Sequence, residues 1–345
     1  MNIYQPRNML VTGGSGFIGS NLAETILRKR FPLLILDNLS RIGSDTNLKW
    51  LKTKGHFDFV HDDIRNENIK HLILHYQPDV IFHLAGQVAM TTSINHPRAD
   101  FEINSLGTLN VLEAVRLHCK NAIMIYSSTN KVYGDLAQFE TLEDKMRYVV
   151  KDFSHGFDES LTLNFHSPYG CSKGAADQYM LDYARIYGLK TLVFRHSSIF
   201  GVRQFSTYDQ GWVGWFVKQA LASMKEPHRE AFTISGNGKQ VRDILFSEDI
   251  VNCYFMAIDH IHQCQGQAFN IGGGYDNSLS ILELLNFLEQ ELDVKLNFTQ
   301  LPWRQSDQKV FIANINKAKK YFSWLPTINK ETGLRMMIEW MKQHA

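Results

Sequence analysis

The chain has 345 residues, 44% of them apolar, and a formal net charge of +1 at pH 7. Acidic and basic residues are interspersed, so the charge pattern does not indicate binding to nucleic acid or to an anionic membrane. No apolar run approaches the ~20 residues that cross a bilayer, and residues 1–7 are polar, so we expect neither a membrane span nor a signal peptide. The four cysteines lack metal-ligand spacing, which predicts reduced thiols, no bound metal and a cytoplasmic protein. They are Cys119, Cys171, Cys253 and Cys264.

The first part of the chain alternates short apolar strands with amphipathic helices. Strands are predicted over residues 9–11, 32–36, 57–60, 79–84, 121–126 and 191–195, and helices over residues 21–30, 48–54, 69–76, 101–118 and 168–187. Because the strands are largely apolar throughout, this order is typical of a parallel sheet that helices cover on both faces. Residues 134–166 are more polar and lack a clear period. We expect them to form a long loop that closes over the site as a lid.

Beyond about Gly201 the elements become shorter and more mixed. Helices are predicted over residues 212–224, 247–259, 281–292 and 331–342, and strands over residues 232–235, 268–271 and 296–300. We therefore expect an α/β protein with a doubly wound, Rossmann-type nucleotide-binding domain over residues 1–200, to which residues 245–275 return. A smaller α/β domain takes most of residues 201–345. Open α/β sheets bind ligands at the carboxyl ends of their strands, so the substrate is expected between the two parts.

The segment VTGGSGFIGS, from Val11 to Ser20, joins the first predicted strand to the first predicted helix. Glycines in such a turn let a pyrophosphate approach the backbone, and the helix N-terminus supplies N–H groups and a partial positive charge. The next strand is followed by Asp37, eighteen residues after Gly19, where a dinucleotide-binding fold places a carboxylate for the adenosine ribose. A glycine-rich surface turn is the alternative, but the order of strand, helix, strand and acid favours a dinucleotide site.

Tyr169 and Lys173 are four residues apart on a predicted helix and therefore share one face. A phenol acts as a base at neutral pH only if its pKa is about 3 lower than usual, and one nearby cation contributes an energy of this size. The ammonium of Lys173 and a positively charged nicotinamide ring are both suited to this. Thr129, after the fifth predicted strand, can pass a proton between an alcohol and Tyr169. The alternative for Thr129 and its neighbours Ser127 and Ser128 is a turn whose hydroxyls bond only the local backbone.

Together these motifs resemble the extended short-chain dehydrogenase/reductase family of NAD-dependent epimerases and dehydratases, over essentially the whole chain. The resemblance implies a catalytic triad of Thr129, Tyr169 and Lys173. It implies that the cofactor is bound by Gly13, Gly16, Phe17, Ile18, Asp37, Asn38, Ser40, Arg41, Asp63, Ile64, Leu84, Ala85, Gln87, Asn104, Ser127, Tyr169, Lys173 and Ser197. Asp37 would repel a 2′-phosphate, which favours NAD, although Arg41 leaves NADP open. Members assemble through helices that include residues 168–187, so a homodimer or homotetramer is expected.

Dehydratases of this family carry an Asp-Glu pair directly after the catalytic threonine, and one of these carboxyls supplies the acid for the elimination. This chain has Asn130 and Lys131 there, which argues against dehydration. Residues 87–93, 208–215 and 235–243 are similar to segments of epimerases that invert C2 of a CDP-linked 3,6-dideoxyhexose. Those enzymes act through a transient 2-keto sugar, in the synthesis of lipopolysaccharide O-antigen sugars.

This resemblance implies a CDP-sugar substrate. The implied substrate contacts are Gln87, Thr129, Ser198, Gln210, Gly211, Val213, Arg242 and Arg304. The two arginines would bind the diphosphate, to which guanidinium groups present several planar donors; surface ion pairs are the alternative. Trp212 and Trp215 either border the cytosine or belong to the core. Two other functions stay open: an epimerase acting at C2 of CDP-glucose or at C4 of a UDP-hexose, and a non-catalytic NAD-binding regulator, which the intact catalytic pair disfavours.

Overall fold

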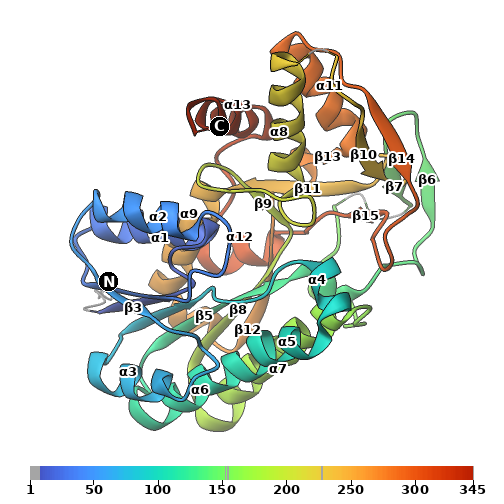
Figure 1. The fold of residues 1–345 in the computed structure, drawn as a ribbon. Helices are drawn as coiled ribbons and strands as arrows, with labels where there is room; N and C mark the ends of the chain where they lie inside the picture. Colours follow the sequence, from blue (N-terminus) through green and yellow to red (C-terminus); the bar gives the residue numbers. More distant parts are fainter. Residues whose placement is uncertain (1–7, 152, 154, 227, 345) are drawn as a thin grey trace.

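The computed structural model describes residues 8–151, 153, 155–226 and 228–344; residues 1–7, for which we expected no signal peptide, lie outside the described residues. Within the described ranges, seven parallel strands form one sheet in the order β12-β8-β5-β4-β1-β2-β3 (Figure 1). The strands are β1 (Met9–Thr12), β2 (Leu33–Asp37), β3 (Asp58–His61), β4 (Val80–His83), β5 (Ile123–Thr129), β8 (Lys190–His196) and β12 (Gln267–Ile271). The strand order reverses between β1 and β4. A doubly wound sheet binds its ligand at such a reversal.

Helices cover both faces of this sheet, as the sequence predicts. One face is covered by α1 (Phe17–Arg28), α2 (Ser44–Lys52), α9 (Ser247–Asp259) and α12 (Asn316–Phe322), and the other by α3 (Asn68–Tyr76), α6 (Gly107–His118) and α7 (Pro168–Tyr187). Side chains of successive strand residues point to opposite faces, so Met9 and Val11 belong to one buried cluster and Leu10 to the other. Both clusters are apolar, which explains why these strands are apolar throughout.

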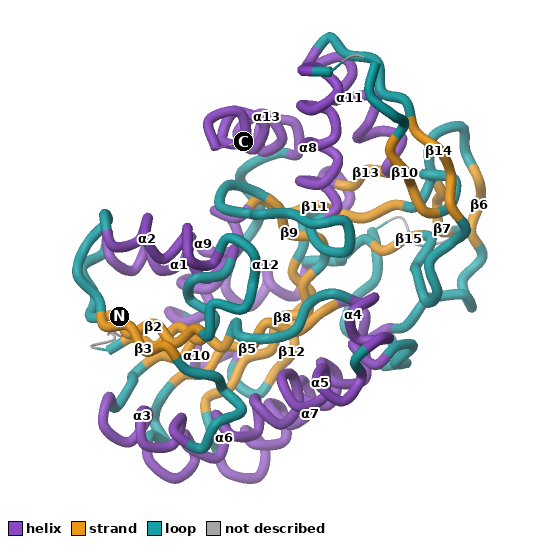
Figure 2. The backbone as a smooth tube through the Cα atoms, viewed as in Figure 1, coloured by secondary structure: helices purple, strands orange, loops and turns teal. Residues whose placement is uncertain are grey.

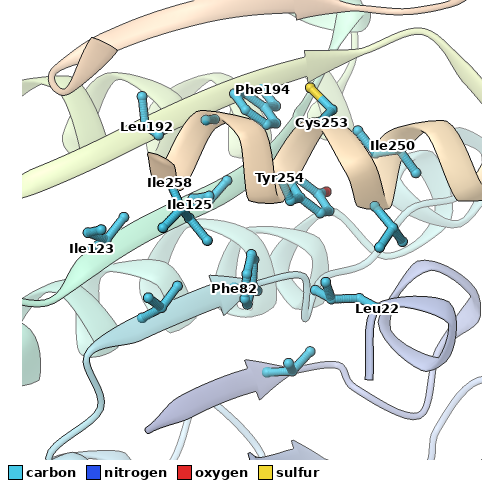
Figure 3. Packing of buried hydrophobic residues seen from close by; sticks show 14 of the residues in the cluster. Leu22, Phe82, Ile123, Ile125, Leu192, Phe194, Ile250, Cys253, Tyr254 and Ile258 are labelled. Carbon is cyan, nitrogen blue, oxygen red and sulfur yellow. The ribbon is translucent and has the colours of Figure 1, made fainter. Parts of the chain in front are cut away.

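Helix α9, which comes late in the chain, packs against the first sheet. Tyr254 of α9 stacks on Phe194 of β8, with ring centroids 5.5 Å apart, and also contacts Phe82 of β4 (Figure 3). All three side chains are fully buried. Burying a side chain of this size contributes about 1.5–3 kcal/mol. Helix α9 is therefore part of the layer that covers the first sheet.

The remaining elements form a smaller layer beside the carboxyl ends of the large sheet (Figure 2). In the described part of the chain they comprise β9 (Ser198–Phe200), β11 (Val241–Phe246), β13 (Ser278–Ser280) and β15 (Val310–Phe311) in one sheet, and β10 (Phe232–Ser235) paired with β14 (Phe298–Leu301). Helices α8 (Trp212–Lys225), α11 (Ile281–Leu292) and α13 (Lys330–His344) pack around a third apolar cluster. Shorter helices are α4 (Met90–Asn95), α5 (Pro97–Phe101) and α10 (Ile261–Cys264).

The helix predicted over residues 101–118 is interrupted. Helix α5 is followed by a π-helical turn, Glu102–Leu106, and then by α6. Single π turns are frequent at functional sites, and this one places Asn104 against the loop after β4. None of the helices in the described ranges has the length and apolar character that a membrane-spanning helix needs.

The lid prediction for residues 134–166 is wrong. The described part of this segment holds a short hairpin, β6 (Thr141–Glu143) and β7 (Tyr148–Val150), and its side chains line neither cavity described below. Tyr148, Val150 and Phe157 are instead buried in a fourth apolar cluster with Phe311 of β15. These large apolar side chains, spaced irregularly, fix the segment to the smaller sheet.

Candidate active site

The glycine turn between β1 and α1 forms part of a cavity of about 330 Å³ at the carboxyl ends of the first strands. Gly13 has a φ of +71°, and a Cβ atom there would lie 2.7 Å from the backbone nitrogen of Ala85. Gly16 is the N-cap of α1, no side chain caps this helix end, and its first turn has no acidic residue. The partial positive charge of the helix end is therefore available to a phosphate group. The turn fits the pyrophosphate of a dinucleotide.

The carboxylate of Asp37 lies at the end of β2 and lines the same cavity. Burial raises its pKa, while backbone N–H groups of Leu39 and Ser15 donate to it at 2.8 and 2.9 Å and oppose that rise. Asn38 donates to Asp63 at 2.7 Å, which links two of the predicted cofactor residues. The predicted cofactor residues that line this cavity are Gly13, Gly16, Phe17, Ile18, Asp37, Asn38, Ser40, Arg41, Asp63, Ile64, Leu84, Ala85, Gln87 and Ser127.

The start of α7 places Tyr169 beside Thr129 at the end of β5. Ser167 caps the helix by accepting a hydrogen bond from the backbone N–H of Gly170 at 3.0 Å, and Pro168 occupies the first turn. Thr129 and Tyr169 line a second cavity, of about 340 Å³, and their side chains are hydrogen-bonded. The two cavities share lining residues, including Ser127, so they meet where β5 ends.

Lys173 lies one helical turn further along α7 and is buried behind the cavity wall. Its Nζ donates to the backbone oxygen of Ser127 at 2.5 Å and lies 4.4 Å from the centroid of the Tyr126 ring. Burial lowers the pKa of Lys173 to about 7, although the carboxylates of Asp100 and Asp177 oppose that change. Tyr169 and Lys173 are both buried on the same face of α7, as their spacing of four residues requires.

The structure corrects one expectation about Tyr169. Burial raises its pKa to about 12, and the hydrogen bond with Thr129 offsets only part of that effect. Asp100 raises it further, and Lys173 is not among the groups that shift it. The residues of the chain therefore keep the phenol protonated, and Lys173 alone does not produce the predicted lowering of its pKa. A positively charged nicotinamide beside the phenol would supply the missing stabilisation.

A buried polar network behind Tyr169 was not predicted from the sequence. Asp100 is 1% exposed and accepts hydrogen bonds from Gln87 (2.7 Å), Asn104 (3.2 Å) and Ser172 (2.5 Å). Asn104 Oδ1 in turn accepts from the backbone N–H of Gln87 at 2.9 Å. Asn104 and Gln87 therefore hold the loop after β4 against α7, and Asn104 acts from behind the cavity wall. The aspartate gives no sequence signal because it belongs to no predicted motif and precedes the helix predicted over residues 101–118.

The second cavity brings together the predicted substrate residues. Those that line it are Thr129, Ser198, Gln210, Gly211, Val213, Arg242 and Arg304, with the predicted cofactor residue Ser197 beside them. Gln87 lines only the cofactor cavity. Trp212 and Trp215 line the cavity and also pack against the third apolar cluster, so their place in the core is confirmed and their contact with the cytosine stays a prediction. The sequence prediction missed Lys131, Tyr208, Gln240 and Asp307 as lining residues. Tyr208 and Gln240 lie within the segments singled out by resemblance, and Lys131 and Asp307 lie two and three residues after the predicted Thr129 and Arg304.

A cluster of charges forms one wall of this cavity. Asp307 accepts from Arg242 Nη2 at 2.7 Å and from Lys131 Nζ at 3.3 Å. Arg304 lies near enough to lower the pKa of Asp307 further, and its guanidinium donates to the backbone oxygen of Tyr208 at 3.1 Å. Three cations thus share one carboxylate. The wall carries an excess of positive charge that suits an anionic ligand.

Comparison with known proteins agrees with this geometry. The profile of the family described as GDP-mannose 4,6 dehydratase matches residues 10–337. The CDP-paratose 2-epimerase of Salmonella typhi is 56% identical over 333 residues, which cover 96% of this chain and 98% of that protein. The UDP-glucose 4-epimerase of Thermotoga maritima, solved with UDP-glucose, is 27% identical with a TM-score of 0.82, covering 98% of this chain and 99% of that one.

The UDP-glucose 4-epimerase of Thermus thermophilus, solved with NAD, is 25% identical with a TM-score of 0.81 and covers 98% of this chain and 100% of that one. The family match, the full-length relative and the two structures thus agree with the seven-stranded parallel sheet of the described residues and with NAD as the cofactor. The chain therefore belongs to the NAD-dependent epimerase/dehydratase family, the extended branch of the short-chain dehydrogenases/reductases.

Proposed function

We propose that the protein is a nucleotide-sugar epimerase that inverts C2 of a CDP-linked 3,6-dideoxyhexose, converting CDP-paratose to CDP-tyvelose with NAD as cofactor. The observation that carries the proposal is the 56% identity to a CDP-paratose 2-epimerase over nearly the full length of both chains. Asn130 and Lys131 support it, because neither can supply the carboxyl that a 4,6-dehydratase has after its catalytic threonine. Asp37 supports NAD, since its charge would repel a 2′-phosphate.

The chain supplies the proton transfers of such an epimerisation. Bound NAD provides the hydride acceptor and, later, the hydride donor. With the positive charge of bound NAD lowering its pKa, Tyr169 would begin as a phenolate, which the Thr129 hydroxyl stabilises. Its Oη takes the proton of the C2 hydroxyl as that carbon is oxidised, and Tyr169 becomes a neutral phenol. Tyr169 returns the proton to the C2 oxygen once the 2-keto sugar has been reduced on its other face. Oxidation and reduction cancel, so turnover consumes no external reductant.

Inversion requires the ketone to present both faces while the nucleotide stays in place. Arg242 and Arg304, in the charged wall, are suited to hold the diphosphate throughout. The sugar would then turn about its bonds to a fixed diphosphate.

We also propose that residues 1–200 and 245–275, joined by α12, bind the cofactor and that most of the rest binds the CDP-sugar, because α9 and α12 pack on the large sheet.

We propose a homodimer or homotetramer assembled through α6 and α7. Large apolar side chains are exposed on these helices and just before them: Phe101 (54%), Leu117 (50%), Tyr179 (44%), Ile186 (54%) and Tyr187 (40%). Exposed apolar patches of this kind are typical of subunit interfaces. We also place the protein in the cytoplasm, since its four cysteines are free. Light scattering of the protein and of Ile186→Asp tests the assembly: the variant should be smaller in mass.

The test of the function is to follow CDP-paratose deuterated at C2 by proton NMR. We expect inversion at C2 with the label retained at C2, because hydride leaves and returns within one closed site. Exchange of the label with solvent would reject direct hydride return. Inversion at C4, or activity only on CDP-glucose or on a UDP-hexose, would show that the substrate assignment is wrong.

A further inference from the structure

Lys131 lies between the catalytic threonine and the charged wall of the substrate cavity. It follows Thr129 by two residues, and its backbone N–H donates to the Thr129 hydroxyl at 3.2 Å. Its side chain lines the same cavity as Tyr169 and is 17% exposed, and its Nζ reaches Asp307 at 3.3 Å. Lys131 therefore connects the catalytic hydroxyl to the charged wall.

The charges around Lys131 are unbalanced in a way that favours a diphosphate. Among the described residues, Lys131, Arg242 and Arg304 surround the carboxylate of Asp307, so this cluster of four side chains carries two positive charges in excess. Burial lowers the pKa of Lys131 to about 8; Asp307 opposes this change, and Arg242 and Arg304 add to it by repulsion. A buried ammonium with a lowered pKa is stabilised by any further anion. The diphosphate of a nucleotide sugar carries two negative charges.

The structure of the sugar determines how close to the catalytic tyrosine the positive charge that binds the diphosphate must lie. C2 is bonded directly to C1, which carries the diphosphate, whereas C4 lies across the ring from C1. An enzyme that oxidises C2 must therefore bring the diphosphate closer to its catalytic tyrosine than an enzyme that oxidises C4. Arg304, which donates to Ser235 and Tyr208, lies toward β10 and the start of α8. Lys131 lies beside Thr129, where the closer phosphate has to be.

We propose that Lys131 binds the sugar-proximal phosphate of the substrate and so places C2, rather than C4, opposite Tyr169. This inference rests on the proposed function and names a specificity-determining residue for it. Asn130 helps to fix this arrangement, because its amide donates to the side chain of Gln308, next to Asp307, at 3.1 Å. The dipeptide Asn130-Lys131 thus stands where a dehydratase has acids and places a cation there instead.

The competing explanation is that Lys131 is only the partner of Asp307. If so, removing either member breaks the same ion pair, and Lys131→Met and Asp307→Asn should weaken ligand binding alike. If Lys131 binds phosphate, the two changes act in opposite directions. Lys131→Met removes an attractive charge, whereas Asp307→Asn removes a repulsive one and keeps the shape of the side chain.

The experiment compares the NAD-loaded protein with these two variants, with Lys131→Arg and with the control Lys309→Met. Lys309 belongs to the same segment as Asp307, but its Nζ contacts the Tyr148 ring and lines no part of the substrate cavity. Calorimetry measures CDP binding, with CMP as a ligand that lacks the second phosphate. We expect Lys131→Met to bind CDP at least about tenfold more weakly, as for a lost charged contact, and to bind CMP with a smaller change. Asp307→Asn should bind CDP at least as tightly as the parent, and Lys309→Met should match the parent.

The same proteins are then given CDP-paratose, and proton NMR measures the ratio of C4-inverted to C2-inverted product. Lys131→Met should lose C2 inversion by at least about tenfold and raise this ratio, and Lys131→Arg should retain part of the C2 activity. NAD content and melting temperature confirm that each variant is folded. Parent-like CDP affinity and C2 inversion in Lys131→Met, or equal weakening by Lys131→Met and Asp307→Asn, would overturn the inference while leaving the proposed function intact. If the parent protein does not invert CDP-paratose at C2, the proposed function is wrong, and so is the inference that Lys131 places C2 opposite Tyr169. The CDP affinities of the variants would then still show whether Lys131 binds the phosphate.

Discussion

The cofactor side and the substrate side of this site are built in different ways. The cofactor cavity is formed largely by turns that follow β1, β2, β3 and β4, within the first quarter of the chain, and it depends on backbone groups and close approach at glycine. The substrate cavity collects side chains from the ends of β5 and β8, from α8, from β10 and β11 and from residues 304–307. Its chemistry depends on charges such as Arg242 and Asp307. The first side is therefore sensitive to shape, and the second to charge.

The largest expected effect lies where the two sides meet. Tyr169→Phe should lower turnover by ~10²–10⁴-fold, because it removes the group that exchanges the substrate proton, and should change substrate binding little. Thr129→Ala should lower turnover less, since it removes a hydrogen bond to the base and not the base. Steady-state kinetics with CDP-paratose measures both, and Tyr187→Phe on the same helix is the control. Near-normal turnover in Tyr169→Phe would contradict the mechanism.

On the cofactor side, shape is tested by Gly13→Ala. The new Cβ would lie 2.7 Å from the Ala85 backbone at a φ of +71°, so the protein should lose most of its bound NAD and melt earlier. Left-handed strain alone costs about 1–3 kcal/mol. Gly188→Ala is the control that introduces backbone strain without a steric clash, because Gly188 has a φ of +70° and its added Cβ would meet nothing within 4 Å. The measurement is the nucleotide released on denaturation. Equal NAD content in the two variants, or release mainly of NADP, would contradict the assignment of this turn or of Asp37.

On the substrate side, charge is tested by Arg304→Ala. Loss of one charge-assisted contact costs about 1.5–3 kcal/mol, which corresponds to a rise in KM of roughly tenfold to a hundredfold with kcat little changed. Arg242→Ala should behave similarly, with some added loss of stability because it leaves Asp307 without its guanidinium partner. Arg335→Ala, an exposed partner of Glu291, is the control. A fall in kcat at constant KM would instead place the arginine beside the reacting carbon.

The smallest expected effect concerns pH. Lys131 is protonated below a pKa of about 8 and loses its charge as pH rises through that value, so an anionic ligand binds more weakly on the alkaline side. The charged groups that face it are Asp307, Arg242 and Arg304. The dissociation constant of CDP should therefore rise about threefold between pH 7.5 and 8.5, as for one titrating group. Lys131→Arg should abolish this rise; a rise that persists in the variant would assign it to another group.

The structure confirms sequence predictions best where the signal is local. Helix α7 spans the residues predicted for it, because Ser167 and Pro168 form a start signal and Gly188, with a φ of +70°, forms a stop signal. Strands β9 and β11 were not predicted, since the first is three residues long and the second contains Arg242 and Asp243 within an apolar run. Asp243 is fully buried, and burial raises its pKa to about 6 while the Ser197 hydroxyl donates to it. Only a tertiary partner makes such a residue compatible with a buried strand.

Local sequence patterns are sufficient to predict the glycine turn with Asp37, the pairing of Tyr169 with Lys173 and the doubly wound order of strands and helices. Each depends on spacing within one or two neighbouring elements, and backbone geometry enforces that spacing in any context. The tertiary structure alone decided that residues 134–166 pack against β15, that Asp100 supports the loop after β4, and that Lys131 meets Asp307. That last pair is separated by 176 positions. Its electrostatic character depends on how much water the fold excludes and on which other charges it brings near, and neither quantity is encoded in local sequence spacing.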